Sequence, residues 1–262
     1  MESSVIYLKN IFFRRKDHQI ISDVSWQIEP GQHWALLGAN GSGKTSLLKI
    51  VTGYEWPSSG EVYVLGEHFG ECSLFELRKT IGWVSSTITT QVPLLDSAVQ
   101  IAVSGIDTSI GLHREFSKEE FKRAHQALEM AGGAGFADQQ FGTLSQGEQQ
   151  KTLIARCLVN QPRLIILDEP CIGLDPAARE SFLRDIGCLS EKPNAPGIIY
   201  VTHHVEEIFP WIDHVLVLKN GKVLASGSKE NVICAEVLSK AFDCKCRVQQ
   251  NGQRYQMNIQ EP

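Results

Sequence analysis

The stretch Trp34-Ala-Leu-Leu-Gly38-Ala-Asn-Gly-Ser-Gly-Lys44-Thr45-Ser46-Leu-Leu-Lys-Ile-Val51 decides the fold of this chain. It begins with a short apolar run, Trp34 to Leu37, of the kind that forms a strand buried on both faces. It continues as a glycine-rich turn of the pattern GxxxxGKT and then as a helical stretch from Thr45 to Val51. A strand, this turn and a helix in that order predict a phosphate-binding loop, because bare glycines let backbone N–H groups approach phosphates closely.

The candidate nucleotide contacts of this loop are consecutive in the sequence. They are Gly38, Ala39, Asn40, Gly41, Ser42, Gly43, Lys44, Thr45 and Ser46. Lys44 would supply a positive charge to the β- and γ-phosphates of ATP, and the hydroxyl of Thr45 is placed to ligate Mg²⁺. The alternative, a glycine-rich turn with an incidental lysine, is disfavoured by the strand and the helix on either side.

A pair of carboxylates follows a second apolar run, in Leu164-Ile-Ile-Leu-Asp168-Glu169. Open α/β sheets bind ligands at the carboxyl ends of their strands, so we expect Asp168 to hold Mg²⁺, directly or through water. Because successive strand residues point to opposite sides, Glu169 is expected to address the attacking water instead, as general base. The alternative is a solvated acidic strand end.

The segment Leu144-Ser-Gln-Gly-Glu148 precedes a predicted helix, 146–159. Ser145 would present its hydroxyl, and Gly147 its bare backbone N–H, at the N-terminus of that helix. This arrangement predicts a second phosphate-binding surface. Taken alone, the same residues could be a helix cap and nothing more.

The rest of the chain alternates short apolar runs with helical stretches, which predicts a parallel α/β sheet. The runs are Trp34–Leu37, Leu164–Leu167, Ile198–Val201 and Val215–Leu218, and another helical stretch is Pro176–Leu189. The opening segment, 5–28, has the pattern strand, turn over residues 14–18, strand, as in an antiparallel subdomain. Residues 87–144 lack strand-like runs, and Ser117 with Glu120 predicts a capped helix through Met130 there, while Asp96-Ser97 opens another.

Two hairpins are predicted near the end of the chain. Asn220-Gly221 separates an apolar run from Lys222–Ala225, and Asn251-Gly252 separates 247–250 from 254–259. We therefore expect one domain over residues 1–240, with an inserted helical subdomain at about 87–157, and a small hairpin appendage over residues 241–262.

Composition bounds the class of protein. The chain has 262 residues, 42% of them hydrophobic, enough for a sizeable core, and its net charge of −5 disfavours direct binding to nucleic acid. No run of 18 apolar residues and no secretory signal is found, so a reducing, cytoplasmic setting is expected. The seven cysteines do not suggest a disulfide framework, and no metal site is assigned to Cys244 and Cys246.

The order GANGSGKT, LSQGE, LIILDE, GLD and VTHH resembles the nucleotide-binding domain of the ATP-binding cassette (ABC) ATPases, over roughly residues 5–230. The resemblance implies an α/β P-loop NTPase (RecA-like) core, an antiparallel β subdomain and an inserted helical subdomain. It implies ATP, Mg²⁺ and a head-to-tail dimer in which Ser145 and Gly147 contact the partner's ATP and Asp175 crosses the interface. It assigns His203 as the switch histidine near the γ-phosphate, and strand alternation is expected to turn His204 away.

The chain departs from the family pattern at Ser86, at Arg15, and at the third and fifth positions of LSQGE, where the common form is LSGGQ. Ser86 stands where cassettes carry a loop glutamine, so its contact with Mg²⁺ would pass through water. Arg15 stands where an aromatic ring stacks on the adenine; its guanidinium can also stack on a purine, or it is a solvated arginine in a turn. These variants, with LSQGE, look most like the single cassettes labelled molybdenum-transport or photorepair-type.

The expected function is ATP hydrolysis, with Lys44, Glu169 and His203 as catalytic residues. The partners implied are a second cassette, identical or different, and a membrane permease, with the chain cytoplasmic or peripheral on the inner face of a membrane. An ABC ATPase acting on a nucleic-acid or protein assembly is the alternative. A regulatory nucleotide-binding module without turnover is the third reading.

Overall fold

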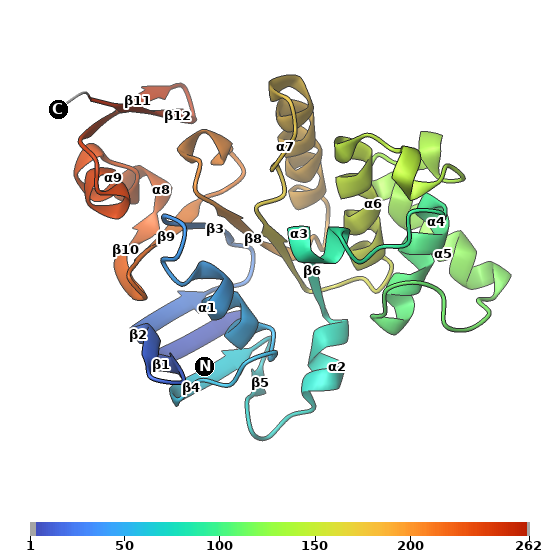
Figure 1. The fold of residues 1–262 in the computed structure, drawn as a ribbon, viewed down its shortest axis with the longest axis horizontal. Helices are drawn as coiled ribbons and strands as arrows, with labels where there is room; N and C mark the ends of the chain where they lie inside the picture. The colour runs from blue at the N-terminus through green and yellow to red at the C-terminus, as the bar shows by residue number, and fades with distance from the viewer. Residues whose placement is uncertain (1–3, 261–262) are drawn as a thin grey trace. The chain divides into compact units, whose positions relative to one another are not determined.

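Two separated segments of the chain, up to Leu77 and from Gly197 onward, make up unit 1 of the computed structural model, and residues 78–196 make up unit 2. The structure describes residues 4–260 and, at residues 86 and 87, the backbone alone. Figure 1 follows the chain through its helices and strands. The mixture of parallel and antiparallel sheets with intervening helices is the α/β fold that the sequence predicts.

An antiparallel sheet in unit 1 has the strand order β2-β1-β4-β5. The strands are β1 (Ile6–Arg15), β2 (His18–Ile28), β4 (Ser59–Val64) and β5 (Glu67–His68). The pairing of β1 with β2 runs to Arg15 opposite His18, so the turn consists of residues 16 and 17. Arg14 and Arg15 therefore belong to the strand, and the turn expected over residues 14–18 is shorter than predicted.

Strand β3 (His33–Leu37) lies between two parallel neighbours in unit 1, β8 (Gly197–Thr202) and β9 (His214–Lys219). Each is one or two residues longer than the apolar run that predicted it. Strand β10 (Lys222–Ser228) pairs antiparallel with β9 through the two-residue turn Asn220-Gly221. Both turn residues have positive φ, 49° and 73°, as the predicted Asn-Gly hairpin turn requires.

Unit 2 contains the parallel pair β6 (Ile81–Ser85) and β7 (Leu164–Asp168). Three of its helices, α4 (Ala98–Ser104), α5 (Lys118–Met130) and α6 (Gln146–Leu158), pack on one another, and α6 also packs on β6. Ser97 and Ser117 cap α4 and α5, each in a reciprocal capping box, which confirms the predicted helix starts. The remaining α-helices of unit 2 are α3 (Ser86–Thr89) and α7 (Pro176–Ser190), and α2 (Leu74–Lys79) crosses the boundary at residue 78. Among the described residues, three short 3₁₀ helices, η1 (Gly105–Asp107), η2 (Ala134–Phe136) and η3 (Phe141–Thr143), complete the unit.

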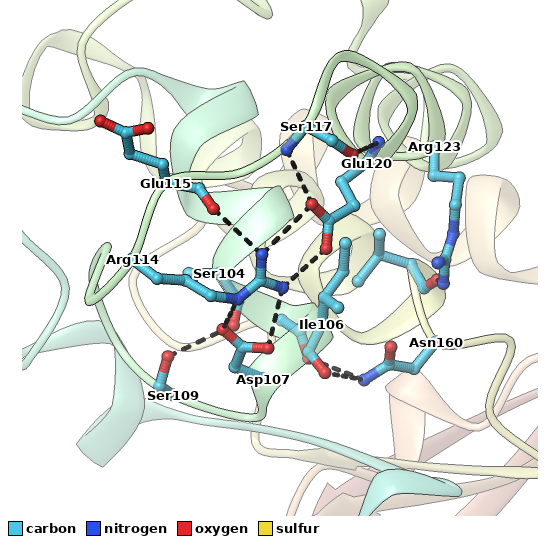
Figure 2. Close-up of polar contacts among 12 residues, drawn as sticks. Ser104, Ile106, Asp107, Ser109, Arg114, Glu115, Ser117, Glu120, Arg123 and Asn160 are labelled. Atoms are coloured by element: carbon cyan, nitrogen blue, oxygen red, sulfur yellow. Dashed lines mark hydrogen bonds and ion pairs between the residues drawn. The ribbon is translucent and has the colours of Figure 1, made fainter.

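Arg114, in the loop before α5, forms ion pairs with Asp107 and with Glu120 of α5, as Figure 2 shows. The guanidinium of Arg114 donates to Asp107 at 2.8 Å and to Glu120 at 2.6 Å. The carboxylate of Glu120 also accepts the backbone N–H of Ser117 at 2.7 Å, the N-cap contact of α5. The Arg114 guanidinium therefore holds the pKa of Glu120 at about 2, and one side chain joins the loop to the helix start.

The C-terminal part of unit 1 holds two short helices and a second hairpin (Figure 1). These elements are α8 (Lys229–Val232), α9 (Ala235–Phe242), β11 (Cys246–Asn251) and β12 (Arg254–Ile259). Earlier in unit 1, helix α1 (Lys44–Val51) follows β3. Asn251 pairs with Arg254, so the turn is Gly252-Gln253 and not the predicted Asn251-Gly252. Gly252 occupies the first central position with φ 63°, where glycine is favoured.

Within residues 4–260, no helix has both the length and the apolar character needed to cross a membrane.

Candidate nucleotide-binding site

The loop between β3 and α1 is shaped by glycines that serve two different needs. A Cβ on Gly38 would lie 2.4 Å from the carbonyl oxygen of Leu218 and 2.7 Å from the hydroxyl of Ser42, so the packing of the loop on β9 excludes any side chain there. Gly41 has φ 80°, yet a Cβ on it would meet nothing within 4 Å. The conformation and the open space at Gly41 leave the concave face of the loop clear for a ligand.

The N-terminus of α1 lacks a side-chain cap among the described residues. Its N-cap is Gly43, with φ 107°, and within residues 4–260 no side-chain hydrogen bond caps the helix. The hydroxyl of Ser42 is buried and has no hydrogen-bond partner among the described residues. Backbone N–H groups at the positive end of a helix, beside an unpartnered hydroxyl, form a site for an anion.

Lys44 supplies the positive charge of this loop. The residue is 6% exposed, and Nζ donates to the carbonyl oxygens of Gly38 at 2.7 Å and Ala39 at 3.2 Å. The ammonium is therefore turned back into the loop, where a phosphate bound at the helix N-terminus would meet it. Thr45 is exposed and Ser46 half-buried one and two residues further along α1.

The paired carboxylates follow β7 in unit 2. Asp168 is the last residue of the strand and lies opposite Ser85 of β6 in the parallel register. Glu169 is outside the strand and has φ 52°, in the left-handed region that glutamate rarely adopts. The direction of the Glu169 side chain is therefore set by this turn and not by strand alternation, which corrects the reasoning from the sequence. Backbone strain of this kind is often found at functional sites.

Residues 144–148, the signature segment, contain the start of α6. The backbone N–H and the hydroxyl of Ser145 both donate to a carboxylate oxygen of Glu148, at 2.8 Å and 2.7 Å, and Glu148 N–H donates back to the hydroxyl at 3.4 Å. A Cβ on Gly147 would meet nothing within 4 Å. The described residues therefore leave room for a side chain at position 147. A ligand lying on the helix N-terminus would need that room, which accounts for the glycine. The sequence analysis gave a helix cap at these residues as an alternative, and the structure shows that cap; the reciprocal contact of Glu148, which the pattern Ser-x-x-Glu indicates, was not predicted.

The segment before α7 contacts the signature segment inside unit 2. Gly173 has φ 80°, and a Cβ there would lie 2.7 Å from the side-chain oxygen of Gln146, so glycine leaves room for that amide. Asp175 is the N-cap of α7, and its carboxylate accepts the N–H groups of Ala177 at 2.8 Å and Ala178 at 2.9 Å. Asp175 therefore has a structural role in its own chain besides the interface role that the resemblance implies.

The two histidines lie after the end of β8, which stops at Thr202. Their rings are 4.1 Å apart between centroids and tilted by 40°. The expectation that strand alternation would point His203 and His204 to opposite sides is therefore wrong, because the strand has ended and the rings lie together.

Arg15 and Ser86 stand where related cassettes carry an aromatic residue and a glutamine, and the structure describes the side chain of Arg15 alone. Arg15 lies at the end of β1, where Nη2 is 2.6 Å from a carboxylate oxygen of Glu55 and the guanidinium is 5.9 Å from the centre of the Phe13 ring. Ser86 is the first residue of α3, and its side chain lies outside the described part of the chain.

The strand, glycine loop and helix of unit 1, with the carboxylates and the capped signature helix of unit 2, are features of an ATP-binding cassette. The family model described as ABC transporter matches residues 21–172. The chain belongs to the ABC transporter family and is an ABC ATPase that binds ATP.

Known proteins resemble the chain over most of its length. It is 44% identical over 259 residues to the uncharacterized ABC transporter ATP-binding protein YlmA of Bacillus subtilis, with 98% of both chains covered. It is 35% identical over 214 residues to the ABC transporter ATP-binding protein ModF of Escherichia coli, covering 80% of this chain and 44% of that protein. A dimeric, post-hydrolysis structure of the ATP-binding cassette MJ0796 with ADP and phosphate matches with a TM-score of 0.72 and 26% identity, covering 85% of this chain and 98% of that one.

Proposed function

We propose that the chain is the ATP-hydrolysing subunit of a transporter, in which two cassettes close head-to-tail around two Mg-ATP and drive a membrane permease. The observation that carries the proposal is the pair Gly41 and Gly147. Gly41 lies in the loop before α1 and Gly147 in the first turn of α6, and no described residue would exclude a side chain at either position. Two helix N-termini in one cassette, each with room beside a glycine, are what two phosphate surfaces facing different nucleotides require.

In unit 1, the loop 38–46 binds the phosphates. The N–H groups before and within the first turn of α1 donate to phosphate oxygens, and the buried hydroxyl of Ser42 gains the partner that it lacks among the described residues. Lys44 moves its ammonium from the carbonyls of Gly38 and Ala39 to the β- and γ-phosphates. Arg15 contributes its guanidinium plane to the adenine and keeps its ion pair with Glu55.

A divalent cation fits the donors that the chain offers. The hydroxyl of Thr45 and the carboxylate of Asp168 are hard oxygen ligands, the type that Mg²⁺ prefers. These two residues would hold Mg²⁺, and Ser86 would contact it through water. The cation would neutralise charge on the β- and γ-phosphates.

Glu169 and His203 complete the hydrolytic chemistry. The carboxylate of Glu169, held in the left-handed turn after β7, accepts a proton from the water that attacks the γ-phosphorus. The bond from that phosphorus to the β,γ-bridging oxygen breaks, and ADP and phosphate leave. The ring of His203 donates a hydrogen bond to the γ-phosphate and steadies its charge.

A second cassette, identical or different, supplies the remaining contacts. Ser145 and Gly147 reach the ATP held by the partner, and Asp175 lies at the interface between the two chains. The dimeric MJ0796 cassette with ADP and phosphate supports this arrangement.

The cell-level and domain assignments are part of the proposal. The cassette lies in the cytoplasm, on the inner face of a membrane when it is bound to its permease. Residues 1–240 form the ATPase domain, with a helical subdomain at about 87–157, and residues 241–262 are an appendage. The motif variants and the match to ModF favour the branch labelled molybdenum-transport or photorepair-type.

The hydrolytic part is tested with Glu169→Gln, which keeps the size of the side chain and removes the base. We expect ATP turnover to fall at least about 100-fold, the usual range for removing general-base catalysis, while ATP binding persists and a dimer accumulates in gel filtration with ATP and Mg²⁺. Glu119→Gln, on the exposed face of α5, is the matched control. Turnover at the wild-type rate would remove Glu169 from the base role.

The transport part is tested by fractionating cells that contain the tagged chain and identifying what co-purifies. A polytopic membrane protein in the pellet supports a permease partner. A complex found wholly in the soluble fraction contradicts transport and favours action on a nucleic-acid or protein assembly.

A further inference from the structure

The hairpin formed by β11 and β12 is attached to the segment that follows His203. That segment contains the 3₁₀ turn η4 (Val205–Glu207), and β12 packs against it. The guanidinium of Arg254 donates to the carbonyl oxygen of Glu206 at 2.9 Å, and the backbone N–H of Met257 donates to the carboxylate of Glu206 at 3.1 Å. Both hydrogen bonds join β12 to one residue, three positions after His203.

An aromatic contact strengthens the same attachment. The guanidinium of Arg254 lies over the ring of Phe209, 3.8 Å from its centre. A planar guanidinium over a ring is attracted electrostatically, and the contact also restricts the rotamers of the arginine. Arg254 is therefore held by both Glu206 and Phe209, on either side of the end of η4.

From the inner side, the same segment is anchored to β8. The carboxylate of Glu207, 4% exposed, accepts hydrogen bonds from the hydroxyls of Tyr200 at 3.0 Å and Thr202 at 2.6 Å. The hydroxyl oxygen of Thr202 in turn accepts the backbone N–H of His204 at 2.9 Å. The backbone around His203 is thus fixed by β8 on one side and by the hairpin on the other.

The hairpin has little core of its own. Along β11 and β12, the buried side chains are Cys246 and Tyr255, and the other side chains are half-buried or exposed. Two-stranded hairpins of this kind are marginally stable alone, so contacts with the rest of unit 1 hold it in place. A strand pair that needs η4 for its position also constrains η4.

We propose that the hairpin Cys246–Ile259 is a positioning element for His203, with Arg254 and Glu206 as the positioning residues. The inference rests on the proposed role of His203 in hydrolysis. Loosening the hairpin would let the segment after β8 move, so that the ring of His203 meets the γ-phosphate in the right geometry less often. Phosphate binding by the loop 38–46 would be unaffected, because none of these contacts involves that loop.

The test compares steady-state ATP hydrolysis by the full-length chain carrying Arg254→Ala, Arg254→Lys or Arg247→Ala. Arg247 lies on β11 opposite Asn258 and takes no part in the contacts with η4 described above, which makes it the matched control. We expect Arg254→Ala to lower kcat about tenfold with the KM for ATP within about twofold, since small misplacements of a catalytic group cost rate. Arg254→Lys keeps a donor for the carbonyl of Glu206 and should recover part of the loss, whereas Arg247→Ala should match the wild type.

A double-mutant cycle with His203→Ala decides whether the hairpin acts through the histidine. If it does, Arg254→Ala has no further effect on kcat once His203 is alanine. Losses that multiply in the double variant would overturn the inference, and so would an Arg254→Ala variant as fast as Arg247→Ala. If Arg254→Ala does not fold, as judged by its thermal transition, Glu206→Ala takes its place in the cycle.

The two proposals fail in different ways. If His203→Ala hydrolyses ATP at the wild-type rate, the role of His203 is wrong and the inference falls with it. If His203→Ala is slow but neither Arg254→Ala nor Glu206→Ala is, the inference alone is wrong. The ring resonances of His203 in NMR spectra of the nucleotide-free protein give an independent readout: they should shift in Arg254→Ala and remain in place in Arg247→Ala.

Discussion

The hydroxyl of Ser145 donates a hydrogen bond to the carboxylate of Glu148, 2.7 Å away, at the N-terminus of α6. The same carboxylate accepts the backbone N–H of Ser145 at 2.8 Å. The hydroxyl proposed to face a partner's phosphate is therefore already engaged with an anion. Binding of a nucleotide on this surface has to redirect that hydrogen bond and tolerate the nearby negative charge.

Glu148→Gln is predicted to affect folding and ATP use in opposite directions. An amide keeps one acceptor for Ser145 but removes a charge that interacts favourably with the helix N-terminus, so the free energy of unfolding should fall by about 0.5 kcal/mol. Removing the repulsion between Glu148 and phosphate should lower the KM for ATP by a factor of about 2 to 5. Thermal unfolding and initial rates measure the two effects. A KM unchanged from the wild type would mean that Glu148 does not face a nucleotide.

Gly38→Ala and Gly41→Ala should differ although both change the same loop. At Gly38 the new methyl would meet the carbonyl oxygen of Leu218 at 2.4 Å, and such overpacking costs about 1–3 kcal/mol. At Gly41 the space is open and the cost comes from φ 80° alone, about 1 kcal/mol. We expect a clearly lower unfolding midpoint for Gly38→Ala than for Gly41→Ala in denaturant titrations. Equal midpoints would contradict the close packing of the loop on β9.

Glu120 should make the stability of unit 2 depend on pH. Its pKa is lowered from 4.5 to about 2, first by the hydrogen bond from Arg114, so its contribution is fully present above about pH 4.5 and is lost as the pH falls toward 2. The wild type should therefore exceed Glu120→Gln in melting temperature at pH 6, and the difference should shrink at pH 3. Glu119→Gln, one residue earlier and largely exposed, should show no such pH-dependent difference. A constant difference between pH 6 and pH 3 would contradict the assignment.

Cys157 and Cys188 should differ in their reaction with maleimides. Burial raises the pKa of the Cys157 thiol to about 11, so at pH 7 it has neither access nor a significant thiolate fraction. Cys188 is exposed on α7. Mass spectrometry after digestion should find the label on Cys188 and not on Cys157, and both should react in urea. Equal labelling of the native protein would show that Cys157 is not buried between α6 and β6.

The sequence predicted the strands that the core dictates. The continuous apolar run Ile198–Val201 forms a strand that extends one residue further at each end. Such runs can be recognised in a single sequence because a strand buried on both faces has apolar residues at consecutive positions. The turn of the last hairpin moved by one residue to Gly252-Gln253, because register there is set by pairing of β11 with β12 and not by the dipeptide alone. Strand β4 and helices α2 and α9 have short or mixed patterns and escaped prediction.

The candidate site was predictable where a motif fixes a backbone shape, and less so where side-chain direction matters. In the loop 38–45 the glycines have positive φ angles, and the N-terminus of α1 has no side-chain cap among the described residues, as the glycine-rich motif predicts. The directions of Glu169 and His203 were inferred from strand alternation, but each residue lies just past the end of its strand, where the next turn sets the direction. The attachment of Arg254 to Glu206 joins residues far apart in sequence, and no local signal marks it.

The phosphate loop is shaped by residues that come late in the chain. The carbonyl of Leu218 closes the space at Gly38, and the N–H of Gly221 donates to the carbonyl of Ser42 at 2.9 Å. Synthesis runs from the N-terminus, so β3 leaves the ribosome long before its neighbours β8 and β9, and the turn Asn220-Gly221 after β9, have been made. During that interval the strand is an apolar segment without neighbours, and the newborn chain is exposed to aggregation until its last quarter has been made.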